Sequence, residues 1–243
     1  MIKNVSFERP GPATLEALRD LPVGAVYDSL MAEGIVRCFI EGPRTMTPGK
    51  SIVGPALTLR YLTTREDLLP KDVEERTTFA DFQALELVQP GDVLVFAAGG
   101  MEPAAVLGDV FITRLKVRGA VGVVVDGYVR DTRELTASGL AVYARGCNAI
   151  PVTPRVIPAE INVPVQCGGV TILPGDLILT DDDGAVVIPK NLAITVAEHA
   201  REKEELEGFI REQLLANPDM PPGEIYPPRD KTREAYKKAK SST

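Results

Sequence analysis

Short amphipathic segments alternate along this chain with unbroken apolar runs, and this alternation constrains the fold more than any other feature. In the run LGDVFITRLKVRGAVGVVVDGYVRD, residues 107–118 predict a short helix and residues 120–125 predict a buried strand. Runs of Val, Ile and Leu that are buried on both faces are typical of α/β folds. The other expected strands are 51–61, 93–97, 140–144 and 163–166, and the other expected helices are a broken pair within 14–34, then 77–87 and 193–215.

The length of 243 residues suits one large domain with extensions. We place a single α/β domain over residues 1–217 and a Pro- and charge-rich extension over residues 218–243, which we expect to lie over another surface or to be partly disordered. Residues 63–75 are charged and contain a proline, so we expect a surface loop or insertion there.

Composition argues against several classes of partner. No apolar run approaches the roughly 20 residues that span a bilayer, and the first residues lack the apolar core of a signal peptide. We therefore expect a cytoplasmic protein without a membrane partner. The net charge of −7 offers no basic footprint for nucleic acid, and the basic cluster at 231–240 is interpreted as a solvated tail.

The inventory of reactive side chains narrows the chemistry further. The single histidine, His199, falls on an expected helix surface, and Cys38, Cys147 and Cys167 form no CxxC pair. These facts disfavour a disulfide framework, a multi-histidine zinc site and a Cys-His or Ser-His catalytic pair. The cysteines are interpreted as small buried residues. No GxGxxG or P-loop pattern supports nucleotide or S-adenosylmethionine binding. The groups that remain to carry out chemistry are carboxylates, arginines, backbone amides or a hard metal.

One spaced triplet combines such groups: Asp109, a spacer of twenty residues, and then Arg130-Asp131. A helix followed by a strand reverses the direction of the chain, so the first residue of the helix can lie near the last residue of the strand. Gly108 precedes that helix start, and the amides of Asp109, Val110 and Phe111 would be helix N-terminal donors able to hold a small carboxylate. Arg130 offers a planar fork for a carboxylate or keto oxygen, and Asp131 offers oxygen to a hard cation.

Structural alternatives stay open at this point. Asp109 could merely cap its own helix, or it could form an ion pair with Arg130. Asp131 could cap a helix that begins near Thr132, in a capping box with Glu134. Residues 181–183, three consecutive aspartates, could bind a cation, but they lack the alternating ligands of a calcium loop and are better explained as a solvated turn.

The segments AVLGD (105–109), GVVVDG (122–127) and YVRDTREL (128–135) resemble the RraA-like family. That family includes class II, divalent-metal-dependent 4-hydroxy-4-methyl-2-oxoglutarate aldolases, which also cleave 4-carboxy-4-hydroxy-2-oxoadipate. The resemblance runs in outline from about residue 15 to about residue 215. Residues 63–75 and the tail depart from compact members. The resemblance implies a swivelling β/β/α three-layer fold with a C-terminal helical extension, assembled as a trimer or a dimer of trimers with the site at the subunit interface.

The resemblance also implies roles for individual residues. Asp131 would ligate Mg²⁺ or Mn²⁺, Arg130 would hold the pyruvate moiety of a 2-oxo acid and offset charge on its C2 oxygen, and Asp109 would position a metal-bound water that shuttles protons. Gly108 and the amides of Val110 and Phe111 would take the substrate carboxylate. A glutamate of the neighbouring subunit's C-terminal helix would lie near the metal waters, and Glu207 aligns best, with Glu204 and Glu205 as rivals.

These roles imply a pyruvate aldolase that cleaves a 4-hydroxy-2-oxo acid, with oxaloacetate decarboxylase activity because both reactions give the same enolate. A Schiff-base route would need a buried lysine, and this region offers only Lys116, in mid-helix. Two alternatives remain. Some relatives regulate a ribonuclease by protein binding without catalysis, and others could be lyases for a different sugar-acid-derived 2-oxo acid. The sequence leaves the natural substrate, the metal and the oligomeric state undecided.

Overall fold

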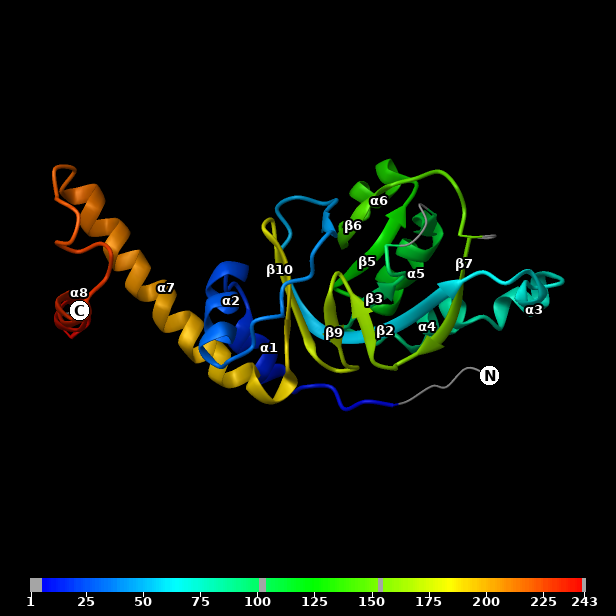
Figure 1. Cartoon of the computed structure of the whole chain (residues 1–243), viewed down its shortest axis with the longest axis horizontal. Coiled ribbons are helices and arrows are strands. Elements are labelled where there is room, and N and C mark those ends of the chain that lie inside the picture. The colour runs from blue at the N-terminus through cyan, green and yellow to red at the C-terminus, as the bar shows by residue number, and fades with distance from the viewer. Residues whose placement is uncertain (1–5, 101–103, 153–154, 242–243) are drawn as a thin grey trace.

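The computed structural model of the protein describes residues 6–100, 104–152 and 155–241. Its body is a nine-stranded mixed sheet that curls into a nearly closed barrel, with helices packed outside it (Figure 1). The strand order is β1-β6-β5-β3-β2-β10-β11, with β4 paired to β5 and β7 paired to β2. The strands of this sheet are β1 (Arg44–Thr45), β2 (Ile52–Thr63), β3 (Val93–Ala97), β4 (Ala105–Leu107), β5 (Gly122–Val129), β6 (Ala141–Cys147), β7 (Val156–Ile161), β10 (Leu177–Asp181) and β11 (Gly184–Ile188).

The centre of the sheet is parallel and buried on both faces. Strands β2, β3, β5 and β6 run parallel to one another, whereas their outer neighbours β1, β7 and β10 are antiparallel to them. Along β3, Leu94 and Phe96 enter one core while Val93, Val95 and Ala97 enter another. Because side chains alternate between faces along a strand, the unbroken apolar run fills two cores at once.

Three layers follow from this alternation. On one face of the sheet lie α4 (Ala80–Leu87), α5 (Asp109–Arg118) and α6 (Thr132–Ala137). On the other face lies a small second sheet made of β8 (Val165–Cys167) and β9 (Val170–Ile172). The order helices, main sheet, small sheet is the predicted β/β/α arrangement, so the predicted fold class is confirmed.

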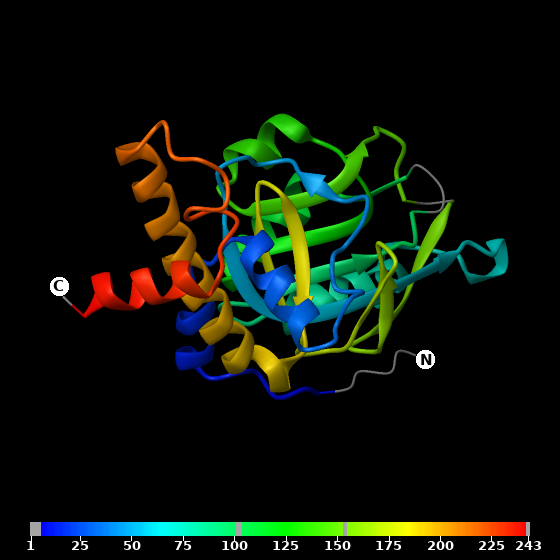
Figure 2. The same cartoon turned by 60° about the vertical axis from the view of Figure 1, so that its left-hand side comes forward.

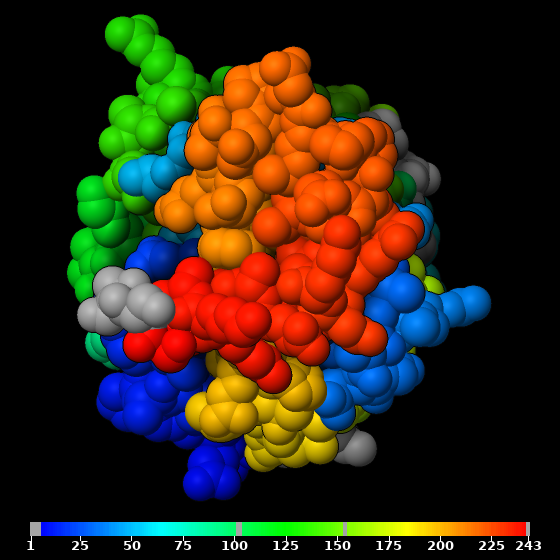
Figure 3. All heavy atoms as spheres, turned by 90° about the vertical axis from the view of Figure 1, so that its left-hand side faces the viewer, coloured from blue at the N-terminus to red at the C-terminus, as the bar shows by residue number. Residues whose placement is uncertain are grey.

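A helical group covers the β10–β11 hairpin and extends beyond the body. The helices α1 (Pro12–Leu18), α2 (Val23–Ala32) and α7 (Ala193–Ala216) pack on the hairpin. The second half of α7 projects away from the sheet (Figure 1), and α8 (Asp230–Lys240) crosses it (Figure 2). Leu206, Ile210 and Ile225 are buried between these segments. Figure 3 shows the C-terminal segment lying over α7 at this end of the molecule. Of the two expectations for this segment, its described part, residues 218–241, thus bears out the first, that it lies over another surface.

Several predicted boundaries need correction. The predicted surface segment 63–75 contains the short helix η1 (Glu66–Leu68) and the start of α3 (Val73–Thr77). Leu107 lies in β4, and the helix predicted from it begins at Asp109. The strands β4 and β7 were not predicted; they are held by partners on β5 and β2, and local sequence carries little sign of that pairing. A further short helix, η2 (Lys190–Leu192), precedes α7.

The remaining predictions have mixed outcomes. All three cysteines are free, but Cys147 is exposed, so the expectation of three buried cysteines is wrong for that residue. The exposed His199 lies beside Glu33, at 3.4 Å between Nδ1 and Oε1, as expected for a surface histidine. Within the described part of the chain, none of the helices combines the length and apolar character that crossing a membrane demands.

Candidate functional site

The triplet meets because β4 and β5 run parallel and end together. The amide of Arg130 donates to the carbonyl of Leu107 at 3.0 Å, which joins the two strand ends. Gly108 and Asp109 follow one strand, and Arg130 and Asp131 follow the other. The predicted return of the chain through helix α5 and strand β5 therefore brings all four residues to one place.

The Asp131 carboxylate lies on the N-terminus of α5. Its Oδ2 accepts a hydrogen bond from the Asp109 amide at 3.2 Å, and the Arg130 Nε lies 3.4 Å from the same oxygen. Asp131 is the residue immediately before α6, but its side chain makes no capping hydrogen bond, so the capping-box alternative with Glu134 is wrong. Arg130 is paired with Asp131 and not with Asp109. The N-terminal end of a helix favours negative charge, which helps to hold this carboxylate.

The backbone of Asp131 is strained in a way that is common at functional sites. Its φ of 57° and ψ of 45° lie in the left-handed region, which aspartate tolerates better than most residues but which still costs free energy. Its side chain is 35% exposed, so the carboxylate can also reach solvent or a ligand. The fold thus maintains an unfavourable backbone to aim this carboxylate at the start of α5.

The amides predicted as a carboxylate cradle are partly occupied. Asp109 is the first residue of α5, and its Oδ1 accepts from the Val110 amide at 2.7 Å. The N-cap of α5 is Gly108 and no side chain caps this helix, so the N-cap alternative for Asp109 is wrong, although its carboxylate does occupy the Val110 amide. Within the described chain, the Phe111 amide has no hydrogen-bond acceptor. A substrate carboxylate would compete with Asp109 for Val110 and would find the Phe111 amide open.

Gly108 is required by the closeness of the two strand ends. A Cβ built on Gly108 would lie 2.6 Å from Asp131 Oδ2 and 3.2 Å from Arg130 Nε, and the first of these distances is too short for a real contact. Any larger residue would thus push the carboxylate off the helix N-terminus. The absence of a side chain here is what lets Asp131 and Arg130 approach the start of α5.

If the chain has the pyruvate aldolase activity that the family resemblance implies, replacing Gly108 with alanine is expected to lower kcat/KM for pyruvate release by about 10- to 100-fold, because small misplacements of reacting groups are that costly. The melting temperature should change little, since the displaced group is a partly exposed side chain. Gly24→Ala is the matched control because a Cβ there meets nothing within 4 Å. Equal kinetics in both variants would show that the position of Asp131 is unimportant.

A cavity of about 210 Å³ adjoins the triplet. The end of β4, Gly108, Asp109 and Arg130 form one wall, and the segment α3–α4 contributes a second wall that the sequence did not predict. In that second wall Arg76 pairs with the buried Asp81. Close by, the buried hydroxyl of Tyr61 has no hydrogen-bond partner among the described residues, and burial together with the Asp81 charge raises the pKa of Tyr61.

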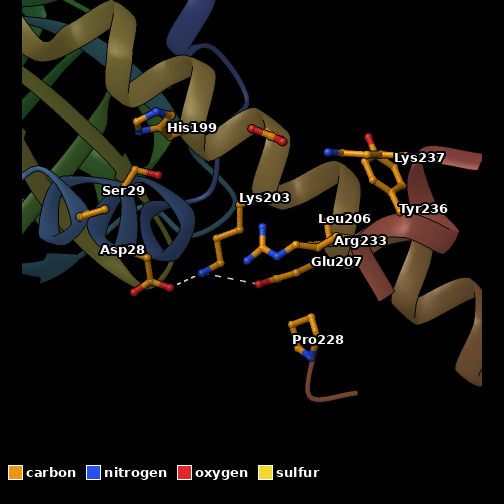
Figure 4. Close-up of a pocket in the computed structure, with 12 residues that line it drawn as sticks. Asp28, Ser29, His199, Lys203, Leu206, Glu207, Pro228, Arg233, Tyr236 and Lys237 are labelled. Carbon is orange, nitrogen blue, oxygen red and sulfur yellow. Dashed lines mark hydrogen bonds and ion pairs between the residues drawn. The ribbon is translucent and has the colours of Figure 1, made fainter. Parts of the chain in front are cut away.

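Glu207 lies apart from the triplet of its own chain. It is on α7, where it lies 3.5 Å from Lys203 and 3.8 Å from Arg211. Figure 4 shows Lys203 between Asp28 and Glu207, in a cavity of about 340 Å³ lined by α2, α7 and the C-terminal segment. Glu207 therefore does not join the triplet of its own chain, and its role in the site of a neighbouring subunit stays a prediction.

The two rival glutamates differ in their surroundings. Glu205 accepts hydrogen bonds from Tyr236 at 2.6 Å and from Lys240, both on α8, and these bonds lower its pKa. Glu204 lies 3.5 Å from Arg211 and lines a cavity together with Glu207. The tail therefore occupies Glu205 and leaves Glu204 and Glu207 as the candidates.

Other polar groups of the motif region are structural. Asp126, which is buried, pairs with Arg145 and accepts from the Gly168 amide at 3.0 Å, so it joins β5 to two neighbouring segments. Lys116 is exposed and donates to the Ser138 carbonyl at 2.6 Å, unlike the buried lysine that a Schiff base needs. Of the predicted turn 181–183, Asp181 ends β10, and Asp182 and Asp183 form the turn, in which the Asp183 amide donates to Asp181 Oδ1 at 2.9 Å.

Comparisons with known proteins identify the family of the chain. A family model described as RraA-like, Aldolase/RraA, matches residues 24–187. The chain is 33% identical over 186 residues to a Halalkalibacterium halodurans protein provisionally named 4-hydroxy-4-methyl-2-oxoglutarate aldolase, covering 76% of this chain and 81% of that protein.

Solved structures give the same assignment. RraAS2 of Streptomyces coelicolor, described as an unusual member of the RNase ES inhibitor RraA family, is 35% identical with a TM-score of 0.77, over 85% of this chain and 99% of that one. An uncharacterized protein of Pseudomonas syringae is 26% identical with a TM-score of 0.73, over 87% of this chain and 96% of that one. The chain therefore belongs to the RraA-like family, which the family model describes as Aldolase/RraA.

Proposed function

We propose that the protein is a divalent-metal-dependent aldolase that cleaves a 4-hydroxy-2-oxo acid, such as 4-hydroxy-4-methyl-2-oxoglutarate, to pyruvate, with oxaloacetate decarboxylation as a companion activity. The observation that carries the proposal is the meeting of Asp131 and Arg130 with the N-terminus of α5, where Arg130 and the first residues of α5 line a cavity. The provisional name of the relative from Halalkalibacterium halodurans agrees with it.

The residues present fit a hard divalent cation better than zinc. Among the described residues, no group of three or more His, Cys, Asp or Glu side chains could hold a metal by itself. Mg²⁺ typically takes one or two carboxylates and completes its shell with water and substrate. Asp131 supplies such an oxygen, held in a strained backbone and reached through the space that Gly108 leaves. The backbone amide of Asp109 contacts this carboxylate, and the Asp109 carboxylate itself accepts from the Val110 amide, so it would act through a metal-bound water.

The chain's own residues would divide the remaining work. The metal, when bound, supplies a Lewis acid for the C2 oxygen of the substrate. The proton of the 4-hydroxyl leaves, the C3–C4 bond breaks, and its electron pair forms the enolate of pyruvate, which takes a proton at C3. Arg130 places its guanidinium against the oxygen where the negative charge develops. In oxaloacetate, loss of CO₂ gives the same enolate.

Asp109 is suited to moving the proton. Its carboxylate accepts from the Val110 amide in this structure. A substrate carboxylate that takes this amide and that of Phe111 would release Asp109 to hold the water that accepts the 4-hydroxyl proton. Substrate binding would thus free the base at the moment when it is needed.

Pyruvate release provides the test. The protein is incubated with 4-hydroxy-4-methyl-2-oxoglutarate or with oxaloacetate, and pyruvate is followed by a coupled dehydrogenase. We expect turnover with Mg²⁺ or Mn²⁺, loss with EDTA, and recovery when excess metal is returned. Turnover that survives EDTA would refute the metal-dependent mechanism, and the absence of turnover on a panel of 4-hydroxy-2-oxo acids would refute the aldolase.

A second candidate is a ribonuclease regulator, which the similarity to RraAS2 favours. Such a protein acts through contact with a partner and has no need for a strained carboxylate beside an arginine. Inhibition of purified RNase ES by this protein, unchanged in an Asp131→Asn variant and without pyruvate release, would support the regulator over the aldolase.

A further inference from the structure

A second arginine of the cavity beside the triplet has no role in the chemistry proposed above. Arg76, on α3, lines this cavity, and its Nη1 donates to Asp81 Oδ1 at 2.7 Å while its Nη2 donates to Asp81 Oδ2. The Asp81 side chain is 1% exposed and the Arg76 side chain is 22% exposed. Both residues line the cavity, but the carboxylate is almost wholly buried and the guanidinium is the more exposed partner.

The guanidinium is held firmly but keeps donors to spare. Its carbon lies 4.7 Å from the centre of the Phe82 ring and 5.2 Å from that of Phe79. An arginine has five N–H donors, and Asp81 takes two of them. An anchor that served only to fix α3 to α4 would not need to face a cavity that also contains Arg130.

The walls between the two arginines are apolar. Phe82 contacts Phe111 edge to face, with 5.2 Å between ring centres, and Pro151 and Val152 complete this part of the lining. The volume of about 210 Å³ lies below the range of roughly 300–1,000 Å³ that is typical for drug-sized ligands. A small, short-chain acid suits such a cavity: its carbon chain would contact the rings, and its ends would need cations.

We propose that Arg76 binds the distal carboxylate of a dicarboxylic 2-oxo acid, with Asp81 as the positioning residue that fixes the guanidinium. The inference rests on the proposed function, in which Arg130 and the start of α5 take the pyruvate end. A carboxylate–guanidinium contact can be bidentate and charge-assisted. A substrate without the second carboxylate would leave this arginine with Asp81 alone, so Arg76 would select for diacids.

Ligand binding tests the selection without requiring turnover. Titration calorimetry in the presence of Mg²⁺ compares 2-oxoglutarate with 2-oxopentanoate, which has the same five-carbon chain and a methyl group in place of the distal carboxylate. We expect the wild-type protein to bind 2-oxoglutarate about 10- to 100-fold more tightly, the range of one hydrogen-bonded charge. Arg76→Met should lose this preference and leave the affinity for 2-oxopentanoate unchanged.

Two further variants keep the test decisive. Arg76→Met leaves Asp81 buried without its partner, which is destabilising. The double variant Arg76→Met with Asp81→Asn therefore removes both charges. It should have a native circular dichroism spectrum and should lose the preference for 2-oxoglutarate in the same way. Arg114→Met is the matched control, because Arg114 makes a similar two-point contact with Glu86 outside the cavity. It should keep the wild-type preference.

The outcomes separate this inference from the proposed function. A wild-type protein that binds neither acid or shows no preference overturns the role of Arg76, as does a double variant that retains the preference. Equal weakening of both acids in the double variant would make Arg76 a structural residue and also overturns the proposal. A preference that disappears with Arg76, in a protein that releases no pyruvate, would refute the aldolase and support the diacid site.

Discussion

Asp131→Asn is expected to lower kcat/KM for pyruvate release by about 10³-fold or more. Loss of the one charged oxygen ligand removes several kcal/mol of transition-state stabilisation, and each 1.4 kcal/mol is a factor of ten. Asparagine tolerates the left-handed backbone that Asp131 adopts, at a φ of 57°. The fold should therefore survive, and the loss would report the missing charge. Steady-state kinetics with Mg²⁺ measure the effect.

The control is Asp20→Asn, because the exposed Asp20 has a left-handed φ of 62°, as Asp131 does. It removes one negative charge far along the chain from the triplet and should leave the kinetics unchanged. Titration of Mn²⁺ in the presence of pyruvate should show weakened metal binding for Asp131→Asn alone. Activity within tenfold of wild type, with unchanged metal affinity, would remove Asp131 from the metal site.

Arg130→Lys is expected to lower kcat by about 10²- to 10³-fold with a smaller change in KM. Removal of a single preorganised donor from a developing oxyanion has a cost of this size. Lysine keeps the charge but lacks the planar fork, so it cannot reproduce a two-point contact. The effect should fall mainly on kcat because negative charge on the C2 oxygen appears in the transition state. Separate determination of kcat and KM for oxaloacetate tests this split.

Arg133→Lys is the matched control, because Arg133 is exposed on α6, three residues further along the chain. Its kinetics should equal those of the wild type. A change in KM alone for Arg130→Lys would restrict Arg130 to binding the substrate carboxylate, and the enolate would then need another stabilising group.

Local pattern predicted the elements that local forces dominate. The run at 93–97 forms β3 with the predicted bounds, because an unbroken apolar run between turns has few other stable environments. The helix predicted over 193–215 is α7, from Ala193 to Ala216. In contrast, β7 was missed because its partner β2 lies almost a hundred residues earlier in the chain, and six residues with weak alternation do not reveal such pairing.

The candidate site also has one part that the local sequence predicted and another part that it did not. The closeness of Asp109 to Arg130 and Asp131 could be predicted, because one helix and one strand return the chain over a short distance. The wall formed by Arg76 and Asp81 could not, because α3 and α4 reach the cavity only through long-range packing, including the contact between Phe82 and Phe111. The charged residues from 63 onward have the composition of a solvated surface loop. Composition alone does not distinguish such a loop from a segment that forms a cavity wall.

By itself the sequence determined the α/β class, the meeting of Asp109 with Arg130 and Asp131, and a chemistry without histidine or paired cysteines. These depend on the periodicity of side chains along one helix and one strand and on residue types. Only the tertiary structure decided that Asp131 lies on the start of α5 through the space at Gly108, that α8 occupies Glu205, and that Arg76 faces the cavity of the triplet. Those contacts join segments whose spacing along the sequence does not predict how close they lie in the folded chain.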